Sequence, residues 1–117
     1  FIQYGFARIK SLIQKSSSFE DFNSEKFEMS QKELEVVKMI SSFPDIIRFA
    51  AKDLSPALLS NYLFNLVKSY NSFYQDSPII REENSDLRNF RLQLSIMTSK
   101  VLERGMSILG IEMPERM

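Results

Sequence analysis

The chain has 117 residues and a mass of 13.7 kDa, which is the size of a single folded domain. Hydrophobic residues make up 44% and charged residues 26% of the sequence, values that indicate a soluble globular protein and exclude a largely disordered chain. The 15 basic and 15 acidic side chains cancel, which argues against a protein that coats duplex nucleic acid non-specifically. The sequence contains no apolar run of about 18 residues and no leader with a cleavage site, so we expect neither a membrane span nor a secretion signal.

Two residue types, cysteine and histidine, are absent, and only three glycines occur. These absences exclude disulfides, zinc fingers, thiol nucleophiles and histidine general bases. Three glycines are also too few for a Walker loop or a dinucleotide-binding fingerprint. The composition therefore favours binding over catalysis, and we expect no cofactor and no metal in this chain. Position 1 is Phe rather than Met, which suggests a piece of a longer polypeptide.

Residues 2–15 are predicted to form a helix with two distinct faces. The apolar face, with steps of four, three and four residues, consists of Ile2, Phe6, Ile9 and Ile13. The opposite face, roughly 160° away at about 100° per residue, consists of Tyr4, Arg8, Ser11 and Lys15. Residues 1–18 hold three cations and no acid, so the first helix presents a local basic face.

The pattern changes after this helix, and residues 16–28 are predicted to be loop or weak helix. Ser30 and Glu33 have the spacing of a capping box, in which each side chain satisfies a free backbone donor at a helix start. A second helix therefore begins there and runs to Phe43. The proline that follows begins a short third helix over residues 44–54.

A fourth helix is predicted over residues 56–75 and has the strongest apolar pattern in the chain. Its core face consists of Leu59, Leu63, Leu66, Tyr70 and Phe73. Tyr62 and Tyr74 lie at the borders of this face, and Phe64 lies off it. A narrow polar stripe on the opposite side consists of Asn61, Asn65, Lys68 and Ser72.

The last helix is predicted over residues 86–109, after a turn and a charged loop, with Ser85 as its cap. Its apolar register consists of Phe90, Leu94, Met97, Val101 and Ile108. Gly105 allows another helix to approach closely, and Gly110 ends the helix in a left-handed conformation. We find no strand-like alternation and no internal repeat, so the predicted fold is an all-α, single-domain bundle of about five helices.

Few residues are suited to chemistry. Two acidic pairs, Glu20 with Asp21 and Glu82 with Glu83, lie in probable loops, and we interpret them as solvated charge because an oxygen-ligand metal site needs several converging carboxylates. Tyr4 is a stronger candidate, because an exposed ring beside cations is suited to stacking on an unpaired base.

The residues alone favour a helical protein-interaction module over single-stranded RNA binding. The apolar contact surface of such a module would consist of Phe64, Phe19, Phe22 and Phe27.

Several short stretches, in their order and spacing, point to a known family. They are Gln3-Tyr4-Gly5-Phe6-Ala7-Arg8-Ile9, Phe43-Pro44, the positions Pro56, Leu59, Tyr62-Leu63, Leu66, Asn71 and Phe73-Tyr74, the pair Arg91-Leu92, Leu109-Gly110-Ile111 and Pro114-Glu115-Arg116-Met117. Together they resemble the C-terminal, DALR-type anticodon-binding domain of arginyl-tRNA synthetases over essentially the whole chain. Phe6 stands where this family often has His, and the tetrapeptide that gave the domain its name does not appear.

The resemblance implies a helical domain that docks on the tRNA anticodon loop and helps to recognise its middle base, a cytosine in most arginine tRNAs. It implies that Tyr4, Tyr62 and Met117 lie around the anticodon nucleotides. The full set of tRNA-contacting residues that we expect is Tyr4, Arg8, Ser11, Lys15, Tyr62, Asn65 and Met117. We also hypothesise that the Met117 carboxylate accepts a hydrogen bond from the exocyclic amine of cytosine.

The resemblance also implies a cytoplasmic parent enzyme that attaches arginine to tRNA with ATP and magnesium. In that family the chemistry belongs to an upstream catalytic domain with His-Ile-Gly-His-like and Lys-Met-Ser-Lys-like loops, and neither loop occurs in this sequence. The expected partners are arginine tRNAs and that catalytic domain, with no membrane. Residues 1–117 would then be a non-catalytic, C-terminal domain of a longer synthetase.

Overall fold

The computed structural model describes residues 1–15 and 22–110. Over these ranges the chain forms five α-helices, one short 3-10 helix and no strand, so the predicted all-α bundle is confirmed. The elements are α1 (Ile2–Lys15), η1 (Ser24–Lys26), α2 (Gln31–Ser41), α3 (Phe43–Lys52), α4 (Pro56–Asp76) and α5 (Ser85–Ile108).

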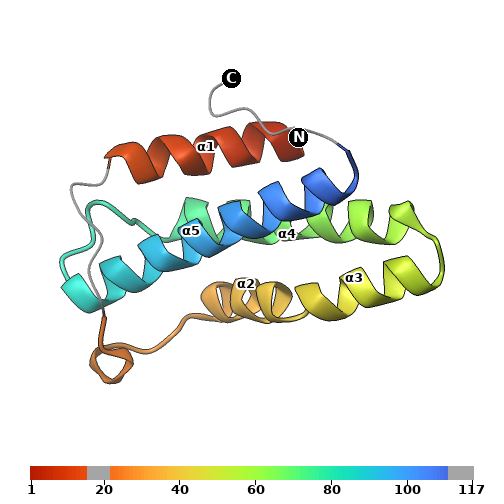
Figure 1. The fold of residues 1–117 in the computed structure, drawn as a ribbon. Coiled ribbons are helices and arrows are strands. Elements are labelled where there is room, and N and C mark those ends of the chain that lie inside the picture. Colours follow the sequence, from red (N-terminus) through yellow and green to blue (C-terminus); the bar gives the residue numbers. More distant parts are fainter. Residues whose placement is uncertain (16–21, 111–117) are drawn as a thin grey trace.

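The helices are arranged in three layers (Figure 1). The long helices α4 and α5 lie against each other in the middle of the bundle. α1 covers one side of this pair, while α2 and α3 follow one another along the other side. η1 packs against α5. The C-terminal ends of α1 and α4, which are about 60 residues apart in sequence, therefore lie at the same end of the bundle.

Most helices begin at the capping residues and prolines that the sequence predicts. The Ser30 hydroxyl accepts a hydrogen bond from the backbone N–H of Glu33, and the Glu33 carboxylate accepts one from the Ser30 N–H, which completes the predicted capping box. Prolines occupy the first turns of α3 and α4, where a backbone N–H has no helical partner. The predicted cap of α5 is wrong by one residue, because Asn84 rather than Ser85 accepts hydrogen bonds from two N–H groups of the first turn.

A single hydrophobic core runs along the middle layer. All five apolar residues predicted for the core face of α4 are buried, and Phe6 and Ile9 of α1 pack into the same core. Phe6 is only 1% exposed, so its ring serves packing. Gly105 lets α5 approach α4 closely, because a Cβ atom there would lie 2.7 Å from the Leu63 Cδ2 atom. Gly110 has a φ of 83°, as a left-handed helix end requires.

The predicted register of α5 is correct for three positions and wrong for two. Met97 and Ile108 are 46% and 51% exposed, whereas Leu102 and Met106 are buried in their place. The reason is that α5 packs against α1, α2 and α4, so its buried face is wider than one stripe and does not follow the single line of apolar residues.

Candidate nucleic-acid interface

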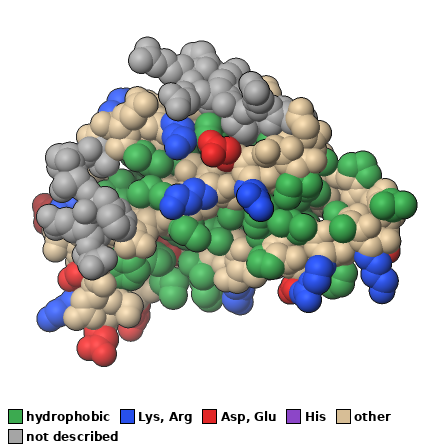
Figure 2. Space-filling view, viewed as in Figure 1, with side chains coloured by type: hydrophobic (Ala, Val, Ile, Leu, Met, Phe, Trp, Pro, Cys, Tyr) green, Lys and Arg blue, Asp and Glu red, His purple; other side chains and the backbone are tan. Residues whose placement is uncertain are grey.

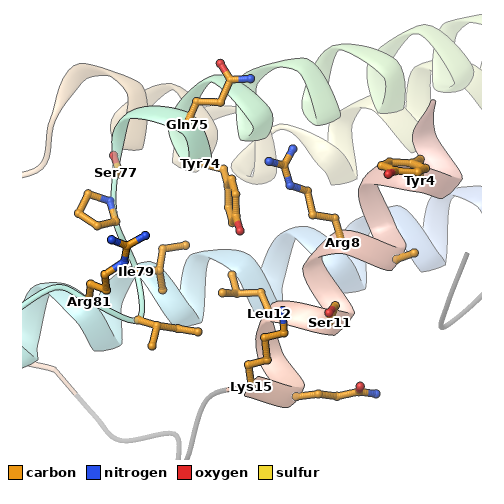
Figure 3. A pocket seen from close by; sticks show the side chains of 14 residues that line it. Tyr4, Arg8, Ser11, Leu12, Lys15, Tyr74, Gln75, Ser77, Ile79 and Arg81 are labelled. Carbon is orange, nitrogen blue, oxygen red and sulfur yellow. The ribbon is translucent and has the colours of Figure 1, made fainter.

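A groove of about 1180 Å³ lies between α1, the end of α4 and the segment 77–81 that follows it (Figure 3). Its lining consists of Tyr4, Ala7, Arg8, Ser11, Leu12, Gln14, Lys15, Tyr74, Gln75, Ser77, Pro78, Ile79, Ile80 and Arg81. The four residues that the sequence placed on the outer face of the first helix are all among them. The structure therefore brings this stripe together as one wall of a concave surface.

The wall formed by α1 follows from the two faces of that helix. Phe6 and Ile9 are buried against the middle layer, and this fixes the rotation of α1 about its axis. With this rotation fixed, the side chains on the opposite face of α1 point away from the core. They are Tyr4, Arg8, Ser11 and Lys15. Tyr4 is 65% exposed, so most of its ring surface is accessible to a ligand.

The opposite wall contributes a second aromatic ring, Tyr74. The Arg8 guanidinium lies over this ring, with 4.1 Å between its carbon and the ring centroid (Figure 3). This cation–π contact joins α1 to α4 across the groove and restricts the conformations of a long, flexible side chain. The apolar pattern of α4 predicts Tyr74 at the border of its core face but does not assign it to the site, because nothing in that pattern shows that α1 lies beside it.

The charge of the groove is positive. Arg8 and Lys15 contribute from α1 and Arg81 from the segment after α4, and none of the described lining residues is Asp or Glu. The two acids next to the far wall, Asp76 and Glu82, form ion pairs with cations of α2 and α5. A chain with zero net charge thus has a local site suited to an anionic ligand.

Tyr62 is a core residue, and the prediction that it borders the apolar face is wrong. It is 6% exposed, its ring stacks on Phe43 with 5.9 Å between centroids, and its hydroxyl donates to the Met39 carbonyl oxygen. Burial raises the pKa of Tyr62 to about 12, against a smaller lowering by a hydrogen bond with Ser42, so the hydroxyl stays neutral and remains a donor at physiological pH. The layer formed by α2 and α3 covers the side of α4 that carries Tyr62. The flat face of the Tyr62 ring is therefore not available for stacking on a base.

Other predicted residues lie elsewhere. Asn65 is exposed on α4 but does not line the groove, and Met117 lies outside the described residues. Glu82 is not simply solvated, because it accepts a hydrogen bond from the Arg91 Nη1 atom at 3.1 Å. The pair Glu20 and Asp21 falls outside the described residues.

The three described aromatic residues of the alternative, protein-binding prediction do not form one exposed cluster. Phe64 is 43% exposed as predicted, and its ring lies against Phe1. Phe22 and Phe27, by contrast, are partly buried and pack on Phe90, at 5.4 and 5.1 Å between ring centroids. Position 19 falls outside the described residues.

One face of the molecule carries many exposed apolar side chains (Figure 2). Figure 2 shows hydrophobic side chains spread across this face, with basic and acidic side chains of both signs lying among and below them. A small apolar hollow of about 170 Å³ lies between α2 and α5. Its lining consists of Phe22, Val37, Ile40, Ser41, Phe90, Gln93, Leu94 and Met97.

Two features are absent from the described residues 1–15 and 22–110. None of the helices there has the length and hydropathy needed to cross a bilayer. Nor do three or more Asp or Glu side chains gather there in a way that could hold a metal ion.

Comparison with known proteins assigns the chain to a family. Residues 2–117 match the DALR anticodon binding domain. The chain belongs to this family. It is 46% identical to an arginine–tRNA ligase of Parabacteroides distasonis and 43% identical to one of Flavobacterium psychrophilum, and all of the chain is covered in both cases. The DALR domain spans about a fifth of the length of these relatives, 20% and 19%.

Solved structures give the same result for the fold. The DALR domain superposes on part of the Thermus thermophilus arginyl-tRNA synthetase with a TM-score of 0.91 and 26% sequence identity, over 99% of this chain and 20% of that one. It superposes on the Plasmodium falciparum arginyl-tRNA synthetase with a TM-score of 0.82 and 28% identity, over 99% of this chain and 21% of that one.

Proposed function

We propose that the chain is the anticodon-binding domain of an arginine–tRNA ligase and that the groove between α1 and residues 74–81 holds unpaired nucleotides of the anticodon loop. One observation carries this proposal: in a chain of the DALR family, the outer stripe from Tyr4 to Lys15 forms a wall of a groove whose described lining residues include three cations and no acid. The volume of about 1180 Å³ leaves room for a segment of a polymer.

The residues of the groove divide into two roles. The exposed ring of Tyr4 offers a flat surface on which a splayed base stacks, an interaction that does not depend on base identity. The cations Arg8, Lys15 and Arg81 are suited to binding backbone phosphates of the RNA. The cation–π contact with Tyr74 keeps the Arg8 guanidinium in the groove, where it can bind a phosphate. Ser11 and Gln75 add groups that can donate and accept hydrogen bonds at base edges.

Catalysis is proposed to belong to the rest of a longer, cytoplasmic enzyme, of which residues 1–117 form one domain. ATP and magnesium supply the activation chemistry for aminoacylation when they are bound there. The groove holds no carboxylate that could bind the metal among its described residues, so this chain is proposed to supply affinity and specificity for tRNA.

The proposal is tested by titrating the 117-residue chain with an arginine-tRNA anticodon stem-loop that carries a fluorescent label. A matched stem-loop, changed only at the middle anticodon base, should bind more weakly. Because three cations line the groove, the logarithm of the affinity should fall with the logarithm of salt concentration with a slope of about −2. Equal affinity for both stem-loops would contradict anticodon recognition.

A protein-docking role is the second candidate, and the apolar hollow between α2 and α5 with the exposed Met97 favours it. This role predicts no discrimination between the two stem-loops. The same titration therefore separates the two candidates.

A further inference from the structure

Arg91 is a buried cation that does not line the groove. It lies in α5 on the inner side of the segment that forms the far wall, and it is only 8% exposed. Buried charges are costly unless they are paired and hydrogen-bonded, so an arginine at such a position needs several acceptors. The structure supplies three of them.

The first acceptor fixes Arg91 to the bundle. Its Nε atom donates to the Oε2 atom of Glu33 at 2.8 Å, and this carboxylate is itself buried. The Oε1 atom of Glu33 accepts the capping hydrogen bond from the Ser30 N–H at 2.7 Å. Both oxygens of Glu33 are thus used, and the carboxylate joins the start of α2 to the second turn of α5.

The other two acceptors lie in the segment that follows α4. The Nη1 atom of Arg91 donates to the carbonyl oxygen of Pro78 and to the Oε1 atom of Glu82 at 3.1 Å. These two residues flank positions 79–81, all three of which line the groove. One nitrogen atom of Arg91 therefore holds both ends of the tripeptide.

The tripeptide is anchored in the core by its first residue and is exposed at the other two. Ile79 is buried, whereas Ile80 and Arg81 are exposed. The Glu82 N–H donates to the Ile79 carbonyl oxygen, and the Arg88 side chain donates to the Glu82 carbonyl oxygen. The shape of this wall is therefore set largely by side chains of α5.

We propose that Arg91 is a positioning residue of the nucleotide groove, which holds the segment 78–82 so that Arg81 faces the ligand. This inference rests on the proposed function for the identity of the ligand. The tether of the segment is a separate statement, which can be tested without RNA. A planar guanidinium is suited to this task because its donors point in fixed, different directions, whereas a lysine ammonium acts as a single point charge.

The test uses two neighbouring acids that differ in their contacts. Glu82→Ala removes the side-chain acceptor at one end of the tripeptide, and Glu83→Ala, the matched control, removes the same charge from an adjacent, exposed position. Electrostatics alone predicts that both variants bind the anticodon stem-loop more tightly, because each loses a negative charge near the groove. The tether predicts the opposite sign for Glu82→Ala, a loss of about two- to fivefold, which is the worth of one exposed ionic contact such as that of Arg81.

Two further measurements complete the experiment. Backbone ¹⁵N relaxation of residues 79–82 should show greater mobility in Glu82→Ala and in Arg91→Lys, and no change in Glu83→Ala. Arg81→Ala should lower the affinity by about the same factor as Glu82→Ala, and the double variant should lose little more, because coupled residues are not additive. Circular dichroism checks that each variant is folded.

The outcomes separate the two proposals. Unchanged relaxation of residues 79–82 in Glu82→Ala and in folded Arg91→Lys, or fully additive losses of affinity with Arg81→Ala, would overturn the positioning role of Arg91. If the unaltered chain binds no stem-loop, the proposed function fails, and the relaxation data still decide whether Arg91 tethers the segment.

Discussion

Replacing Tyr62 with alanine is expected to lower the free energy of unfolding by about 3–5 kcal/mol, the usual cost of removing a large aromatic side chain from a core. The ring is buried between α4 and the layer of α2 and α3, where it stacks on Phe43. Its removal leaves a cavity and also leaves the Met39 carbonyl oxygen without this donor. Urea denaturation of the 117-residue chain, followed by circular dichroism, measures the effect.

The control for this prediction is Tyr62→Phe, which keeps the ring and removes only the hydroxyl. We expect a loss of about 0.5–1.5 kcal/mol from the missing hydrogen bond, with affinity for the anticodon stem-loop unchanged. A stem-loop contact made by Tyr62 would give a different pattern. Tyr62→Ala would then remain as stable as the parent chain while binding the stem-loop more weakly, and that result would contradict the core role described here.

Replacing Tyr4 with alanine is expected to weaken binding of the anticodon stem-loop by about 5- to 150-fold, which corresponds to the roughly 1–3 kcal/mol of one base stacked on an aromatic ring. The ring is 65% exposed and lines the groove, so its removal creates no cavity in the core. The free energy of unfolding should change by no more than about 0.5 kcal/mol, as at other exposed positions. Fluorescence titration and urea denaturation of the same variant measure the two quantities.

Phe64→Ala is the matched control for Tyr4→Ala. Phe64 is also an exposed aromatic residue, but it lies on α4 outside the groove. Its removal should leave stem-loop affinity unchanged within about twofold, the scatter expected of exposed positions. If Phe64→Ala weakens binding as much as Tyr4→Ala does, the RNA surface is not confined to the groove and extends along α4 as far as Phe64.

The sequence predicts most of the fold because local chemistry marks the helix ends. The capping box at Ser30 and Glu33 and the prolines that begin α3 and α4 each act within one turn of the chain. The cap of α5 is wrong by one position because Asn84 and Ser85 are both good capping residues, and the hydrogen bonds of Asn84 decide between them.

Only the wall of the groove that α1 forms can be predicted from the sequence. The stripe from Tyr4 to Lys15 follows from the rotation of α1, which its own apolar residues determine. Tyr74 and Arg81 come from segments about 60 to 80 positions away, and no local pattern shows that they face this stripe. Tyr62 is misplaced for the same reason, because the layer that covers it belongs to α2 and α3.

The most direct test of the groove is to map the RNA-binding surface by NMR. ¹H–¹⁵N correlation spectra of the 117-residue chain are recorded during titration with the arginine-tRNA anticodon stem-loop. The largest amide shift changes are expected on residues 4–15 and 74–81, which form the two walls. Shift changes confined to α2, α3 and the surroundings of Met97, with residues 4–15 unaffected, would show that the groove is not the RNA-binding surface.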